Sequence, residues 1–312
     1  MENFFFALNG VLPIFLVMAI GCYLKYKNIL KEDFYNNASR FVFLIATPAL
    51  LFSDTASVDF NETFDIKFIL VGLGIIVAYI ILLWIFVPIF VKDRVKTGAI
   101  IHCSFRSNFA ILGIPLAKNV LDSVGVAKAE LLLAFGVPLF NICAVVCLAY
   151  WSQGKGDYKK MFKNIVTNPL IIGALSGLVF SVFNIHIPVS ISKTISYVGN
   201  TALGLGLIVL GASFDIKKFT KNIKLTFFSS MLKVVVAPIF GLTLGYLIGF
   251  RGAELMIILI YMGSSSAINS YIMAKEMGSD SELTSGIVVC TTGLSIITLF
   301  LGLFLIKSLG LY

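Results

Sequence analysis

Residues 106–120 read RSNFAILGIPLAKNV, so an arginine, a serine and an asparagine precede a Gly-Ile-Pro sequence inside an apolar segment near 97–117. Arg106 lies ~15 Å along that segment if it is helical, deeper than a side chain at a helix end. Its guanidinium and the amide of Asn108 are donors suited to a carboxylate. Arg106 either contacts such an anion, reaches the membrane surface, or pairs with a carbonyl group or Asp54. Asn108 can donate without the desolvation cost of a fixed charge.

A second polar stretch, YMGSSSAINSYIMAKE over residues 261–276, also carries an asparagine inside an apolar segment. Its serines either donate hydroxyls to a ligand or are small residues that let helices approach closely. Two further asparagines in apolar segments either line the same cavity or form structural hydrogen bonds between helices. The candidate binding residues are therefore Arg106, Ser107, Asn108, Gly113, Pro115, Asn141, Asn200, Ser264, Ser265, Ser266 and Asn269.

Gly113 and Pro115 are expected to interrupt the helix that contains Asn108, because proline removes a hydrogen-bond donor and clashes with the preceding turn. Freed backbone groups cannot face lipid, so the break predicts a cavity or a protein-lined site. The stretch at 261–276 has glycine and serine but no proline, which favours a break less strongly. Two half-helix ends that meet at such a site direct positive dipole ends at an anion. The other prolines in apolar segments are interpreted as kinks or helix ends, at Pro13, Pro48, Pro88, Pro138, Pro169 and Pro238.

Two more polar residues have simpler expected roles. Lys233 is expected to extend to the membrane surface, as long cationic side chains near helix ends do. His102 is expected to donate a hydrogen bond between helices. The five cysteines all lie in apolar segments and are interpreted as small hydrophobic residues, so no metal site and no cofactor are predicted.

These residues require membrane-spanning elements to position them. The chain is 58% hydrophobic and only 13% charged, which indicates an all-α integral membrane protein. Charge-free runs of about 20 residues are long enough to cross the hydrocarbon core. They predict ten helices, at Phe4–Leu24, 36–56, Phe68–Val91, 97–117, Leu131–Tyr150, 165–185, 194–214, 225–249, 253–274 and Leu283–Ile306.

Charge between these segments predicts an orientation. Most Lys and Arg fall in alternate loops, which places those loops in the cytoplasm and both termini outside. The first segment is preceded by no positive charge and is expected to remain as a helix rather than be cleaved. The net charge of +8 is thereby explained by topology and lipid contact, so nucleic acid is not an expected partner. The expected location is the inner (plasma) membrane, with multiple passes.

The two halves of the chain share a weak internal repeat. Each half holds five predicted helices, so the second copy is inverted relative to the first. The predicted units are residues 1–151, a cytoplasmic linker at 152–164, and residues 165–312. The positions that fall in register at a nearly constant offset are Ser107 with Ser264, Ala110 with Ala267, Ala117-Lys118 with Ala274-Lys275, Gly136 with Gly293, Pro13 with Pro169 and Gly21 with Gly177.

Three segments together resemble the auxin efflux carrier family: FRSNFAILGIPLAKN, ALGLGLIVLGASF and SSSAINSYIMAKEMGSD. The resemblance covers essentially the whole chain, without the long central loop of many plant members. It implies crossing, interrupted helices four and nine, a scaffold and dimer surface from helices 1, 2, 6 and 7, and a moving domain from helices 3–5 and 8–10. It also implies a homodimer, an elevator motion, and contact between Asn108 and a substrate carboxylate near Pro115. The usual second crossing proline is replaced here by Ser264–Ser266.

The expected function is secondary transport of a small organic anion, a mono- or dicarboxylate, by alternating access. One alternative is a sodium-coupled carrier of the bile acid type, which favours acidic residues at the crossing. Another is an intramembrane enzyme, but the sequence has no H-E-x-x-H pattern and no paired acids inside apolar segments. A non-enzymatic carrier is the interpretation that fits the residues best.

Overall fold

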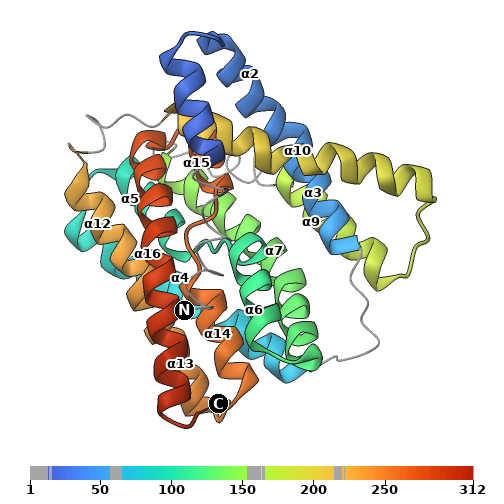
Figure 1. Cartoon of the computed structure of the whole chain (residues 1–312), viewed down its shortest axis with the longest axis vertical. Helices are drawn as coiled ribbons and strands as arrows, with labels where there is room; N and C mark the ends of the chain where they lie inside the picture. Colours follow the sequence, from blue (N-terminus) through green and yellow to red (C-terminus); the bar gives the residue numbers. More distant parts are fainter. Residues whose placement is uncertain are drawn as a thin grey trace.

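The structure is a computed structural model that describes residues 13, 16–56, 65–152, 163, 166–213, 220 and 222–311. Within this part of the chain the secondary structure is helical throughout, apart from one isolated β-bridge (Figure 1). The helices are Leu16–Tyr26, α2 (Glu32–Phe41), α3 (Thr47–Ala56), α4 (Ile66–Phe90), α5 (Arg94–Phe105), α6 (Ile114–Val120), α7 (Ser123–Ser152), α9 (Pro169–Val182), α10 (Val189–Ser213), α12 (Ile223–Met231), α13 (Ala237–Ile248), α14 (Ala253–Gly263), α15 (Asn269–Glu276) and α16 (Ser281–Ser308).

Most predicted segments coincide with these helices. Five helical stretches are long and apolar enough to cross a membrane, at Ile66–Phe90, Ser123–Ser152, Val189–Ala212, Ile223–Ile248 and Ser281–Ser308. The chain is therefore built as a multi-pass membrane protein. The predicted first helix is described only from Leu16 on, and nearly all of the predicted linker at 152–164 lies outside the described residues.

Lipid-facing surface is visible as exposed apolar side chains at helical spacing. On α4, the exposed fractions of Ile81, Ile85 and Ile89 are 55%, 61% and 56%. Residues four apart lie on one face of a helix, so these three form a stripe on the outside of the molecule. In water such a stripe is unfavourable, whereas hydrocarbon accommodates it.

Three short π-helical segments interrupt the helices: η1 (Val42–Ala46), η2 (Phe109–Gly113) and η3 (Leu232–Val236). In each case a proline follows the segment after one intervening residue, at Pro48, Pro115 and Pro238. The intervening residue donates its N–H five residues back, for example from Ile114 to the carbonyl of Phe109. The wide turn relieves the clash between the proline ring and the preceding turn. Pro48 and Pro238 therefore follow wide turns of their helices, in line with the predicted kinks, and Pro88 and Pro138 lie inside regular helices.

Helix α3 packs closely against α9 and α10. Glycines allow the close approach: a Cβ added at Gly173 of α9 would lie 2.5 Å from the carbonyl oxygen of Pro48. A Cβ at Gly199 of α10 would lie 2.8 Å from the backbone of Leu50. Substitution at either glycine would force these helices apart.

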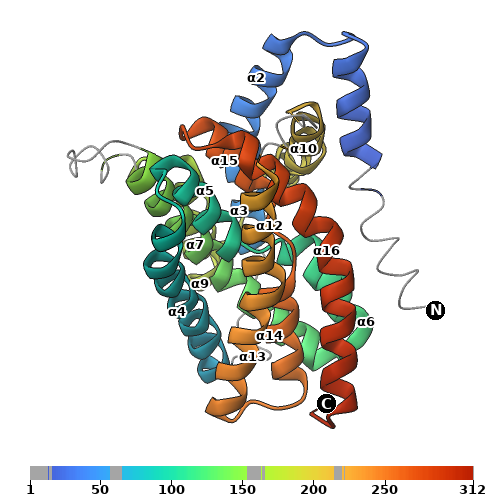
Figure 2. The same ribbon diagram turned by 90° about the vertical axis from the view of Figure 1, so that its left-hand side faces the viewer.

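The remaining helices form a second, larger group in which α5 packs on α4 and α7, α12 packs on α16, and α14 packs on α13. Figures 1 and 2 show that α16 runs along the long axis of the molecule, while α10 lies across it. The two interrupted elements, α5 to α6 and α14 to α15, both belong to this group and cross within it.

Candidate functional site

The first break occurs where α5 ends at Phe105, and the chain is non-helical over Arg106–Asn108. This position corrects the prediction that Gly113 and Pro115 make the break. Gly113 has helical dihedral angles at the end of η2, and Pro115 occupies the first turn of α6. The π-helical turn that precedes Pro115 accommodates its ring. The glycine is needed for packing, because a Cβ there would collide with the Phe109 ring.

The second break follows α14, which ends at Gly263. The chain is non-helical over 264–268, and α15 begins at Asn269. Helix nine therefore breaks fully without a proline. The side chains of the serines supply the reason, because hydroxyls can replace helical hydrogen bonds to carbonyl groups.

The two breaks cross as an antiparallel pair, joined by an isolated β-bridge between Ser107 and Ser266. Each serine also caps the other helix: the Ser107 hydroxyl donates to the Tyr261 carbonyl at 2.6 Å. The Ser266 hydroxyl donates to the Cys103 carbonyl at 2.6 Å. Because the last carbonyls of a helix have no intrahelical partner, this exchange satisfies groups that would otherwise be stranded.

Several carbonyl groups around the second break accept hydrogen bonds. Ser264 donates both its N–H and its hydroxyl to the Ile260 carbonyl, at 3.0 Å and 2.6 Å. The Ser265 carbonyl accepts the Asn108 N–H at 2.8 Å. The Met262 carbonyl accepts the ammonium of Lys233 at 2.9 Å. The end of α14 is thus closed by donors from the first break and from η3.

Lys233 contradicts its predicted role. Its side chain is 0% exposed and points into the protein rather than to the membrane surface. The reason is the position of η3, which packs against α14 beside the break. The negative end of the α14 dipole makes a cation favourable at this position.

Arg106 is also buried, with an exposed fraction of 5%. Its Nη2 donates to Asn141 Oδ1 at 2.9 Å, and its Nη1 lies 3.0 Å from the sulfur of Met273. The Asn141 amide in turn donates to the Val137 carbonyl of α7 at 2.8 Å. The guanidinium therefore reaches neither the surface nor Asp54, and the contacts that hold it are with neutral groups.

Three polar atoms near the crossing are buried without a hydrogen-bond partner in the described part of the chain: Asn108 Nδ2, Ser265 Oγ and the Tyr261 hydroxyl. Unsatisfied buried donors cost free energy, and in native proteins they mark a functional position or a bound molecule. The Tyr261 ring packs on Phe109 with ring centroids 4.6 Å apart, which holds it beside the first break.

The remaining predicted residues divide between the crossing and other places. Asn269 is half-buried at the start of α15, next to the second break. Pro115 is exposed on α6, and Asn200 is exposed on α10. No contact described in the structure joins Asn200 to either break. Buried His102 does not donate between helices as predicted, since neither ring nitrogen has a partner among the described residues.

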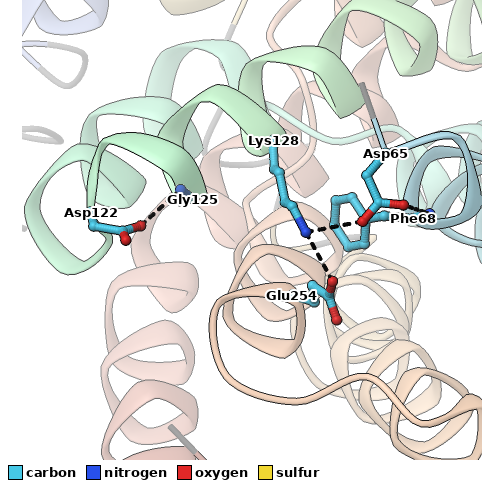
Figure 3. Close-up of polar contacts among 6 residues, drawn as sticks. All are labelled: Asp65, Phe68, Asp122, Gly125, Lys128 and Glu254. Carbon is cyan, nitrogen blue, oxygen red and sulfur yellow. Dashed lines mark hydrogen bonds and ion pairs between the residues drawn. The ribbon is translucent and has the colours of Figure 1, made fainter. Parts of the chain in front are cut away.

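An ion-pair cluster connects helices at the end of the molecule where α4, α7 and α14 begin (Figure 3). Lys128 of α7 lies 3.0 Å from Asp65 and 3.0 Å from Glu254 of α14. Asp65 also caps α4 by accepting the Phe68 N–H at 3.0 Å. The Phe68 N–H, and after it Lys128, lower the pKa of the Asp65 carboxyl below its usual value. The cluster ties the start of α14 to two helices of the first half of the chain.

Comparison with known proteins identifies the family to which this chain belongs. The profile of a family described as membrane transport protein, the auxin efflux carrier family, matches residues 6–158 and 157–303. This chain belongs to that family. It is a membrane transporter, and the resemblance seen in its sequence motifs is confirmed.

Similar proteins in curated collections are also transporters. The transporter is 27% identical to an uncharacterised transporter of Methanocaldococcus jannaschii over 94% of its own length and 97% of the relative. It is 24% identical to an uncharacterised transporter of Methanothermobacter thermautotrophicus, over 93% and 95% of the two chains. It is 24% identical to auxin efflux carrier component 1 of Arabidopsis thaliana over 41% of its length and 22% of the plant protein.

Sequence reasoning missed two groups of the transporter's crossing. Tyr261 was included in the polar stretch but not singled out, because a tyrosine before a serine run is indistinguishable from a core aromatic residue. Met273, which contacts Arg106, lies in the short helix beyond the second break and carries no polar pattern. The crossing of the two breaks brings both residues near the predicted ones.

Proposed function

We propose that this transporter is a secondary carrier of a small organic anion, a mono- or dicarboxylate, with its binding site at the crossing of the two breaks. The observation that carries the proposal is the buried amide of Asn108, whose Nδ2 has no partner among the described residues. An amide donor held in a dry site is suited to bind a carboxylate oxygen.

Charge supports an anion rather than a cation. Arg106 is buried next to Asn108, and its contacts are with the neutral groups of Asn141 and Met273. A buried cation with neutral partners is costly, so an anion that approaches the crossing is stabilised.

The packing supports alternating access of an elevator type. The helix at Leu16–Tyr26 with α2, α3, α9 and α10 would be the scaffold, and α4–α7 with α12–α16 would be the moving domain, as an inverted pair of repeats. Supporting this division, α3 packs tightly on α9 and α10, whereas the two breaks cross inside the other group. Hydrogen bonds between the breaks would keep the site intact as the domain moves.

The test is current recording on a solid-supported membrane from the protein reconstituted into lactate-loaded vesicles, to which a panel of small dicarboxylates that includes succinate is added outside. The wild-type protein is expected to give currents that Asn108→Ala strongly reduces at a substrate concentration below saturation. Asn119→Ala is the matched control, because Asn119 is exposed on α6 of the same segment. Equal currents from folded Asn108→Ala and wild-type protein would contradict the proposed site.

A further inference from the structure

Two buried side chains near the crossing are basic, and each is positively charged when protonated. In the described part of the chain, the buried charged residues are Arg106 and Lys233, and no aspartate or glutamate is buried. They come from different halves of the sequence and different helices, with Arg106 at the first break and Lys233 in η3 beside the second. The crossing therefore concentrates fixed positive charge within the membrane-spanning part of the molecule.

Neither cation is neutralised by the groups that bind it. Lys233 donates to a backbone carbonyl, and Arg106 contacts an amide oxygen and a thioether sulfur. The described ion pairs all lie elsewhere, at the surface or in the Lys128 cluster. A hydrogen bond to a neutral group returns only part of the solvation that a buried ion loses.

Helix dipoles do not remove this charge. Four helix ends meet at the crossing: the C-terminal ends of α5 and α14, which are negative, and the N-terminal ends of η2 and α15, which are positive. Their partial charges offset one another in pairs. The charge that remains is that of Arg106 and Lys233.

We propose that the transporter is an obligate anion exchanger, an inference that rests on the carrier function proposed above. When an anion occupies the crossing, it offsets the two cations, and the domain can move across the membrane. When the crossing is empty, the same motion would carry two uncompensated cations through a low-dielectric region. The empty form therefore stays on one side until a second anion binds there, and each anion that leaves is replaced by another.

The chemistry of the two cations also indicates the class of substrate. A dicarboxylate offsets both charges, whereas a monocarboxylate leaves one uncompensated. We expect dianions to be exchanged faster than monoanions of similar size. Exchange of two dianions of the same charge moves no net charge, whereas exchange of a dianion for a monoanion does.

The experiment measures uptake of [14C]succinate into proteoliposomes that contain either unlabelled succinate or only potassium chloride, with the membrane potential held near zero by potassium and valinomycin. Initial uptake into succinate-loaded vesicles is expected to be at least about tenfold faster, since moving one uncompensated ion costs several kcal/mol. Equal uptake into both vesicle types would overturn obligate exchange. Absence of uptake into both would instead contradict the proposed carrier function.

Charge-removing variants assign the effect to the two residues. Arg106→Gln and Lys233→Gln each remove one buried charge, so the ratio of loaded to empty uptake is expected to fall toward one. Lys92→Gln removes an exposed lysine at the end of α4 and should leave the ratio unchanged. Arg106→Lys keeps the charge and should keep the ratio even if its rate is lower. A ratio that stays at the wild-type value in folded Arg106→Gln and Lys233→Gln would overturn the role of the two cations.

Discussion

The first break, at Arg106–Asn108, is followed by a π-helical turn and a proline, whereas the second, at 264–268, leads directly into α15 with neither. Both nevertheless interrupt a helix in the apolar part of the molecule. What they share is a reciprocal pair of hydrogen bonds: the Ser107 hydroxyl donates to the Tyr261 carbonyl, and the Ser266 hydroxyl donates to the Cys103 carbonyl. The comparison shows that a membrane helix can break where a neighbouring segment donates hydrogen bonds to its free carbonyl groups. Each break therefore depends on the other.

The two breaks differ in how a cation is supplied. The first break has its own cation in Arg106, whose side chain extends to α7 and α15. The second has no cation in its own sequence and receives Lys233 from η3. They also differ in free donors, because the Asn108 amide is buried without a partner and Asn269 is only half-buried.

The largest effect should separate the two asparagines. Asn108→Ala is expected to weaken substrate binding by about 10- to 100-fold, the usual worth of a hydrogen bond to a charged group. Asn269→Ala should change the substrate affinity by less than about threefold, because a water molecule can take over the hydrogen bonds of a half-buried amide. Both are measured as the substrate concentration that gives half-maximal current. Similar losses in the two variants would mean that the breaks contribute equally to binding.

Lys233→Met should make the folded protein more stable while it changes transport. Methionine has a similar volume and removes a buried charge, and such replacements are neutral or stabilise by about 1–4 kcal/mol. The loss of one hydrogen bond to Met262 opposes this gain but is smaller. The measurement is thermal unfolding in detergent at a fixed pH. A clearly lower Tm would show that closing the end of α14 outweighs the cost of burying the ammonium.

The two hydroxyls that link the breaks should contribute equally. Ser107→Ala and Ser266→Ala each leave a buried carbonyl without its donor, which costs about 1–3 kcal/mol. Ser265→Ala is the matched control, because its hydroxyl has no partner among the described residues. Denaturant titration compares the free energies of unfolding. If only one of the two substitutions lowers the free energy of unfolding, the reciprocal pair of hydrogen bonds is not what holds the breaks together.

The smallest effect should come from the cluster that ties α14 to α4 and α7. The lowered pKa of Asp65 means that its contribution to stability is complete above the unfolded value, about 3.9, and is lost as the pH falls through the lower folded value. Asp65→Asn should therefore reduce stability by about 1 kcal/mol at neutral pH, as for an ion pair that is only partly shielded from solvent. The difference in stability between the wild-type protein and Asp65→Asn should shrink on acidification below about pH 4. A stability difference that does not change with pH would indicate that the variant loses only the cap of α4 and not a charge interaction.

Sequence patterns located the helices and the crossing better than the details of the breaks. Apolar length predicted α4 and α16 to within a few residues, because hydrophobic runs report membrane burial directly, whereas α7 begins at Ser123, before the predicted Leu131. The pattern also placed Asn108, Ser107 and the serine run at the crossing. It misplaced the first break at Gly113 and Pro115, because the rule that proline interrupts a helix does not distinguish a break from a wide turn.

Burial of Lys233 could not be predicted either. Its depth depends on which face of η3 meets α14, and this follows from packing between segments that are distant in sequence. The same holds for Arg106, whose partners lie 35 and 167 residues further along the chain. Pair contacts of this kind leave no periodic pattern in one sequence.

The wide turn η3 also determines which side chains of α13 face the neighbouring helix α14. Ile223 is exposed, and Gly241 lies about five regular turns further along, so an unbroken helix would point both toward lipid. Instead Gly241 is buried, and a Cβ there would lie 2.9 Å from the Met262 side chain. One additional residue in the turn rotates α13 by ~100°, which brings its glycine face onto α14. Removing a single residue from Leu232–Val236 would therefore let a regular helix form while Gly241 still faces α14, whereas straightening the turn with all its residues kept would rotate Gly241 away from α14.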